Sequence, residues 1–162
     1  MNLEEKAKKA LEIFKKHETE QIVLRKGEKV IHSGTFNPNS KKKAEYKDIW
    51  VSKEGSGTVN VYKQVAINRS VFESTDYFMT TLMVKRDLNL SVISCRFDSV
   101  LKKIVFDISV DEWHREVLPK MAEIYGVDGF VNNSNIDFPE IVIADYLKKL
   151  KVIQSEKLQL KS

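Results

Sequence analysis

The apolar residues change their spacing along the chain, and this change constrains the fold more than any other feature. Residues 2–17 place apolar side chains three and four positions apart, which predicts an amphipathic helix. Short β-branched runs then follow over residues 21–67 and 88–109, which favours strands. Helical spacing returns after residue 109. Elements segregated in this way predict an α+β fold, a mostly antiparallel sheet with an N-terminal helix and C-terminal helices packed on it.

Three strand pairs are expected. The first joins residues 21–25 to 29–35 through Lys26-Gly27-Glu28, because glycine supplies the positive φ that a tight turn often needs. The second joins residues 48–53 to 58–67 through the turn at 54–57, and the third joins 88–97 to 103–109.

Residues 70–86 carry two conflicting signals. Ser70 and Glu73 have the spacing of a capping box, and a helical stripe of apolar residues follows them, which predicts a helix. The β-branched and aromatic residues in the same segment, such as Thr80 and Phe78, favour a strand. We expect the helix, with the strand as the alternative.

Two helices are predicted near the C-terminus. Ser109 and Glu112 again have capping-box spacing, and Gly126 is a suitable C-terminal cap for a helix over residues 109–126. Pro119 must bend or divide that helix, because proline lacks a backbone N–H. A second helix is expected over residues 138–153.

The domain organisation predicted from the sequence is simple. We expect residues 1–153 to form one α+β domain and residues 154–162 to form a flexible basic tail. The N-terminus has acids and lysines where a signal peptide needs an apolar stretch, so we expect a cytoplasmic protein without a membrane partner. The single cysteine, Cys95, excludes an internal disulfide, and the three histidines lack the spacing of a metal site. No metal or cofactor is expected.

Charge is segregated along the 162 residues, whose net charge is +4. Residues 1–110 carry +6, residues 111–146 carry −6 and residues 147–162 carry +4. Such a distribution can steer association with charged partners, although runs of charge are often only solvated faces.

The segment from residue 41 to residue 53 carries the strongest functional pattern. Lysine ammonium groups displace counterions from phosphates, and aromatic rings stack on unpaired bases. The sequence therefore suggests a small accessory protein in a nucleic-acid-associated process, which contacts nucleic acid through Lys41, Lys42, Lys43, Tyr46, Lys47, Trp50 and Lys53.

The acidic region supports an alternative function. Its carboxylates could engage a basic surface of a partner protein and occlude it, with Trp113 or Tyr125 as the aromatic anchor. In this case the chain is a protein-interaction module or inhibitor, and its partner-binding residues are Asp111, Glu112, Trp113, Glu116 and Glu123.

We do not expect an enzyme, because no nucleophile, base and orienting group can be assembled from neighbouring residues. His114 is expected to lie on the surface. The glycines at 55 and 57 match no phosphate-loop pattern, and we expect them to turn a hairpin with no helix after it. Only a pocket built from residues distant in sequence would change this expectation.

Overall fold

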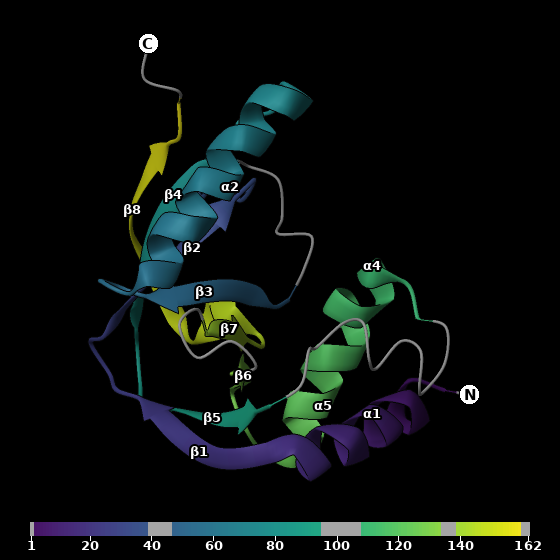
Figure 1. Ribbon diagram of the computed structural model, residues 1–162. Coiled ribbons are helices and arrows are strands. Elements are labelled where there is room, and N and C mark those ends of the chain that lie inside the picture. Colours follow the sequence, from purple (N-terminus) through teal and green to yellow (C-terminus); the bar gives the residue numbers. More distant parts are fainter. Residues whose placement is uncertain (1, 39–46, 95–107, 134–138, 160–162) are drawn as a thin grey trace.

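A computed structural model describes residues 2–38, 47–94, 108–133 and 139–159. It confirms the α+β class, with helices packed on an eight-stranded sheet that is antiparallel except between β5 and β6 (Figure 1). The strand order is β1-β5-β6-β7-β3-β2-β4-β8. The strands are β1 (Glu18–Leu24), β2 (Lys29–Gly34), β3 (Ile49–Lys53), β4 (Phe78–Val84), β5 (Leu88–Ile93), β6 (Gly129–Asn132), β7 (Glu140–Ile143) and β8 (Leu150–Lys157).

The N-terminal helix α1 (Leu3–His17) forms as predicted. Asn2 is its N-cap, and its side-chain oxygen accepts a hydrogen bond from the Glu5 N–H at 2.9 Å. Ala7, Ala10, Leu11 and Phe14 are buried along one face of the helix. The apolar stripe read from the sequence is therefore the packing face.

Strands β1 and β2 exist, but they do not pair with each other as the predicted hairpin requires. β1 pairs with β5 and β2 pairs with β4, and the register continues from one pair to the next, with Leu24 opposite Leu88 and Lys29 opposite Met83. The Gly27 N–H donates to the Val84 carbonyl across the bend between the two pairs. Residues 18–34 and 78–93 therefore form one long, bent antiparallel ribbon, which we call the long ribbon.

The predicted helix over 70–86 and the predicted strand over 58–67 are both wrong. Helix α2 spans Gly57–Glu73, and β4 follows it as an inner strand between β2 and the edge strand β8. Side chains on both faces of β4 are buried, among them Thr80, Thr81 and Leu82, so apolar and polar residues do not alternate along this strand. Its β-branched content, the alternative signal, identified it correctly.

The second predicted C-terminal helix is also wrong. Residues 138–153 contain β7, the 3₁₀ turn η2 (Tyr146–Lys148) and the start of β8. Ile141, Val142 and Ile143 are all buried, because β7 lies inside the sheet with both faces covered, and this continuous apolar run resembles a helix face. β8 continues to Lys157, so residues 154–157 belong to the sheet and not to a tail.

The helical unit after residue 108 follows the prediction closely. It contains α4 (Val110–Glu112), the π-helical turn η1 (Trp113–Val117) and α5 (Leu118–Tyr125). Ser109 Oγ accepts from the Glu112 N–H at 3.1 Å, and Gly126 ends α5 in the left-handed conformation with φ of 74°. The π turn ends just before Pro119, which divides the helix as expected. The strand predicted over 103–109 lies almost entirely outside the described residues.

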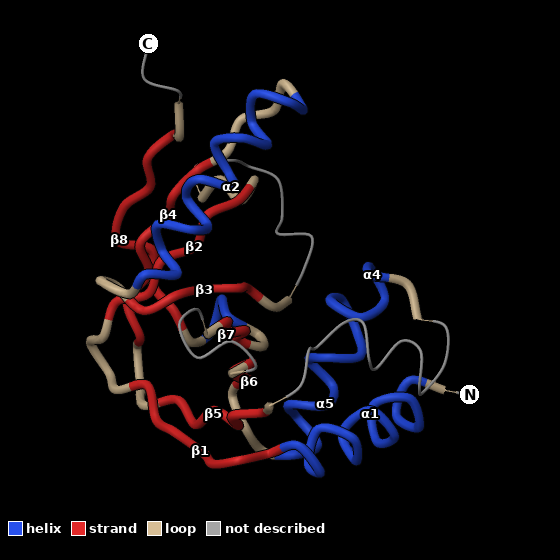
Figure 2. The backbone as a smooth tube through the Cα atoms, viewed as in Figure 1, coloured by secondary structure: helices blue, strands red, loops and turns tan. Residues whose placement is uncertain are grey.

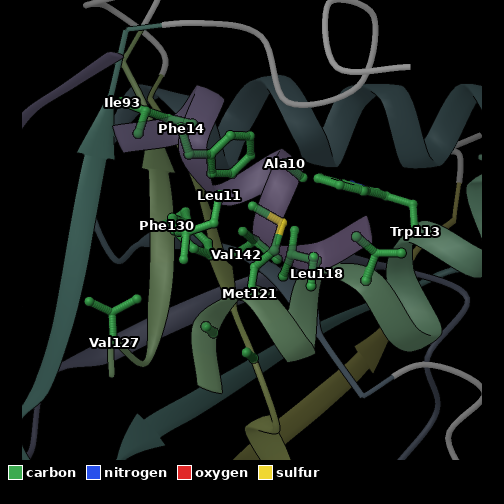
Figure 3. Packing of buried hydrophobic residues seen from close by; sticks show 14 of the residues in the cluster. Ala10, Leu11, Phe14, Ile93, Trp113, Leu118, Met121, Val127, Phe130 and Val142 are labelled. Carbon is green, nitrogen blue, oxygen red and sulfur yellow. The ribbon is translucent and has the colours of Figure 1, made fainter. Parts of the chain in front are cut away.

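Two apolar clusters occupy the opposite faces of the sheet. One packs α1, η1 and α5 against β5, β6 and β7, with Phe14 edge-on to Phe130 at 5.0 Å between ring centroids (Figure 3). The other draws residues from all eight strands, so the sheet curls around it. Figure 2 shows α2 beside the strands at one end and the α1–α5 pair at the other end. The candidate site lies between these helices.

Candidate ligand-binding pocket

A pocket of about 330 Å³ opens where α2, η1 and the strands β2, β3 and β7 meet. Five separate elements contribute to its wall, and the sequence spacing between its residues reaches more than a hundred positions. It is lined by Ser33, Trp50, Tyr62, Val65, Ala66, Arg69, Tyr77, His114 and Glu140. The size is within the range of pockets that hold small organic ligands, roughly 300–1,000 Å³.

Helix α2 supplies four of these side chains from one face. Tyr62, Val65, Ala66 and Arg69 are three and four residues apart, so they lie above one another along the helix. Ala66 is 3% exposed and brings the helix close to its neighbours, whereas Arg69 stays exposed. Sequence reasoning misses this face because the pattern of residues 58–67 predicts a strand.

Arg69 provides the cationic group of the pocket and belongs to a chain of hydrogen bonds. Its side chain donates to the hydroxyl of Tyr77, and that hydroxyl donates to Glu73 Oε2 at 2.8 Å. Burial and the hydrogen bond to Glu73 raise the pKa of Tyr77, so the phenol stays protonated. The guanidinium is thereby held beside an aromatic ring at an exposed position.

Tyr62 and Glu140 form the second polar pair. Burial of the phenol, together with the nearby Glu140 carboxylate that its hydroxyl binds, raises the pKa of Tyr62 well above its ordinary value. Tyr62 therefore donates to Glu140 at neutral pH. The carboxylate keeps further lone pairs, which can accept hydrogen bonds from a ligand.

His114 and Asp48 form a third pair. His114 Nδ1 lies 2.9 Å from Asp48 Oδ2, and both residues are buried, with 9% and 5% of their surfaces exposed. The His114 ring meets Trp50 edge to face at 5.9 Å between centroids. The prediction of a surface histidine is wrong, because the fold brings Asp48 from 66 positions away to orient the imidazole.

Strands β2 and β3 form the floor. Trp50 is partly buried and packs against the α1–α5 cluster. Ser33 Oγ is buried and has no hydrogen-bond partner among the described residues, a state it shares with the hydroxyls of Ser52, Ser56 and Thr58. Of these four hydroxyls, that of Ser33 lines the pocket. A buried hydroxyl without a partner carries a free-energy cost that a ligand or an ordered water can remove.

The predicted nucleic-acid surface is only partly placed. Lys41, Lys42, Lys43 and Tyr46 lie outside the described residues, and Lys47 and Lys53 are exposed. Side chains alternate along β3, so Trp50 and Lys53 point to opposite faces of the sheet. Trp50 lines the pocket and does not share a surface with Lys53.

The acidic candidates lie along α4, η1 and α5. Asp111, Glu116 and Glu123 are exposed. Glu112 forms an ion pair with Lys6, and Glu123 forms one with Lys120 at 3.5 Å. Part of the acidic charge is therefore compensated within the chain.

Trp113, one of the two candidate anchors, is buried and is not presented to a partner. It is 3% exposed and meets Phe14 edge to face at 6.0 Å between ring centroids inside the α1–α5 cluster. Its indole belongs to the core because the π turn directs it toward α1.

The glycine-containing segment at 54–57 does not turn a hairpin, since α2 begins at Gly57. Gly55 has φ of 83°, which explains the glycine there. Cys95 lies outside the described residues. Across the described ranges, no group of three or more histidine, cysteine, aspartate or glutamate side chains is placed to hold a metal ion, and no helix is long and apolar enough to cross a membrane.

The comparisons with known proteins give little beyond this geometry. No family model matches the sequence, and no curated protein matches it. Among solved structures, the chain is similar to a chain of the M. tuberculosis MbcT-MbcA toxin-antitoxin complex, with 12% identity and a TM-score of 0.49. The match covers 98% of this chain and 94% of that chain. At this distance the likeness carries no argument about function.

Proposed function

We propose that the chain binds a small organic ligand in the pocket between α2, β3 and η1. The observation that carries this proposal is the convergence of Arg69, Glu140 and Trp50, which are far apart in sequence, on one cavity of about 330 Å³. Concave sites with aromatic walls and a few converging polar groups are the usual form of small-molecule sites.

The polar groups define the chemistry of the ligand. The Arg69 guanidinium suits a phosphate or carboxylate, because its planar donors match those oxygens. Glu140 suits hydroxyl or N–H donors, and the Trp50 and Tyr62 rings suit a planar heterocycle. A mononucleotide combines an anionic group, a diol and a planar ring, so we infer a nucleotide-like ligand.

Calorimetric titration with three related compounds tests this inference. AMP carries all three groups, adenosine lacks the phosphate, and ribose 5-phosphate lacks the ring. AMP is expected to bind most tightly, and removing the phosphate is expected to weaken binding about tenfold to a hundredfold, as loss of a charge-assisted hydrogen bond of roughly 1.5–3 kcal/mol predicts.

A matched pair of arginine variants locates the effect. Arg69→Gln is expected to weaken the binding of AMP and to leave the binding of adenosine unchanged, so that the variant binds the two compounds with similar affinity. Arg25→Gln is the control, because Arg25 is also exposed and pairs with a carboxylate, that of Asp87. AMP that does not bind, or that binds equally to Arg69→Gln, would contradict the proposal.

The two functions suggested by the sequence remain proposals. For a basic protein partner, the exposed carboxylates of Asp111, Glu116 and Glu123 are the supporting observation. A partner captured from nuclease-treated lysate by the wild type, and lost by a variant with Glu112, Glu116 and Glu123 changed to lysine, would support that interface; equal capture would refute it.

Contact with nucleic acid rests on the lysine and aromatic segment alone. Among the described residues of this segment, Lys47 and Lys53 are exposed, and Trp50 lines the pocket. This function is therefore the weaker proposal, and a salt-dependent titration with an oligonucleotide tests it.

A further inference from the structure

Strands β2 and β3 separate beside the pocket. They pair at Val30 with Lys53 and at Ile31 with Ser52, and the ladder ends there, although β2 continues along β4 to Gly34. Continued pairing would place Ser33 opposite Trp50. Both residues line the pocket instead, so the separation of the two strands gives the cavity its floor.

The side chain of His32 occupies the position where the ladder ends. His32 Nδ1 lies 2.6 Å from the Trp50 carbonyl oxygen. A carbonyl only accepts hydrogen bonds, so Nδ1 carries the proton and donates it. The imidazole thus replaces a backbone donor of β2 and holds β3 at a greater separation than a ladder would.

The His32 ring is fixed from several sides. It meets Phe36 edge to face at 6.2 Å between centroids, and Phe36 meets Tyr146 in the same way at 5.9 Å. A Cβ added to Gly34 would lie 2.8 Å from His32 Nε2, so the glycine leaves the space that the ring occupies. Burial lowers the pKa of His32, which favours the neutral ring with one donor nitrogen.

We infer that His32 is a positioning residue for the pocket. It holds the Trp50 backbone from the sheet face opposite to the pocket, and so sets the spacing between the Trp50 ring and the Ser33 hydroxyl that a ligand meets. This inference rests on the proposed ligand-binding function. It assigns His32 no contact with the ligand.

Two substitutions separate the donor from the bulk of the ring. An asparagine side chain would place an amide N–H near the position of Nδ1, whereas leucine has no donor, so His32→Asn and His32→Leu form the matched pair. In calorimetry, His32→Leu is expected to weaken the binding of AMP about tenfold, whereas the AMP affinity of His32→Asn is expected to stay within about threefold of the wild type. Gly34→Ala, which crowds the ring without removing the donor, is expected to weaken AMP as well.

Nitrogen-15 NMR of the wild type tests the geometry without any ligand. The His32 ring is expected to show the Nδ1–H tautomer at neutral pH, a signature that a merely space-filling histidine does not require. The Nε2–H tautomer would overturn the inference. Undiminished AMP affinity in a folded His32→Leu variant would also overturn it. If His32→Leu does not fold, undiminished AMP affinity in Gly34→Ala would overturn it instead. If the wild type itself fails to bind AMP, the proposed function and this inference both fall; equal binding by wild type and variants removes the inference alone.

Discussion

Substitution of Gly129 by alanine is a severe test of the sheet. Gly129 begins β6 and is paired with Ile143 of β7. An alanine Cβ would lie 2.1 Å from the Val142 carbonyl oxygen and 3.1 Å from the Ile143 Cα, and both are backbone atoms that no rotamer change can move. The strand β6 or β7 must therefore shift, by roughly 1 Å if an ordinary contact is to be restored.

The magnitude follows from what that shift disrupts. Overpacking of a closely packed interior costs about 1–3 kcal/mol, and each weakened ladder hydrogen bond adds about 0.5–1.5 kcal/mol. We expect Gly129→Ala to lower the free energy of unfolding by about 3 kcal/mol, which corresponds to a fall in Tm of roughly 6–12 °C for a chain of this length.

Thermal and urea unfolding measure this loss, and Gly126→Ala is the internal control. Gly126 has open space around the position of a Cβ, but its φ of 74° is unfavourable for alanine, so a loss of only about 1–2 kcal/mol is expected there. A Gly129→Ala protein that unfolds within about 1 kcal/mol of the wild type would refute the close approach of β6 and β7.

Three further predictions concern charge and chemistry. Burial alone would raise the pKa of Asp128, but Arg86, the Asn89 N–H and Lys149 outweigh burial and lower that pKa below its ordinary value. Asp128→Asn should therefore lower the free energy of unfolding by about 1–2 kcal/mol at neutral pH. In urea unfolding, the difference between variant and wild type should vanish as pH falls through the lowered pKa, because the wild-type carboxylate is then protonated. Charge reversal of residues 41–43 should weaken any binding of a fluorescent single-stranded oligonucleotide, and binding should fall as salt rises; no binding at low salt would exclude this contact. AMP incubated with the protein should be unchanged in phosphorus NMR, and appearance of a product would overturn the prediction that the chain is not an enzyme.

Sequence reasoning succeeded where a local signal decided the structure. The stripe of α1, the Ser109 cap and the division of a helix at Pro119 each depend on residues within a few positions of one another. It failed for α2, because the β-branched residues of 57–73 give a strand-like pattern that the packing of Ala66 overrides.

The pocket could not be predicted from the sequence, because its residues come from elements that are distant along the chain. Arg69 and Glu140 line one pocket only because α2 packs beside β2 and β3, and no spacing in the sequence encodes that arrangement. The chain neighbours of His114 indicate a surface position, yet its partner is the distant Asp48. Trp50 lines the pocket, whereas the lysines around it in the sequence suggested nucleic acid as its ligand.

The long ribbon also dictates an order of events during synthesis. Residues 18–34 cannot complete their pairing until residues 78–93 have left the ribosome, and β4 cannot pair on its other side until β8 (Leu150–Lys157) has been made. Until β8 arrives, β4 presents an open edge of the kind that joins strands of other molecules. Premature termination before residue 150 would therefore leave a nearly complete sheet with an exposed apolar edge, and such fragments should aggregate or be degraded where the full chain folds.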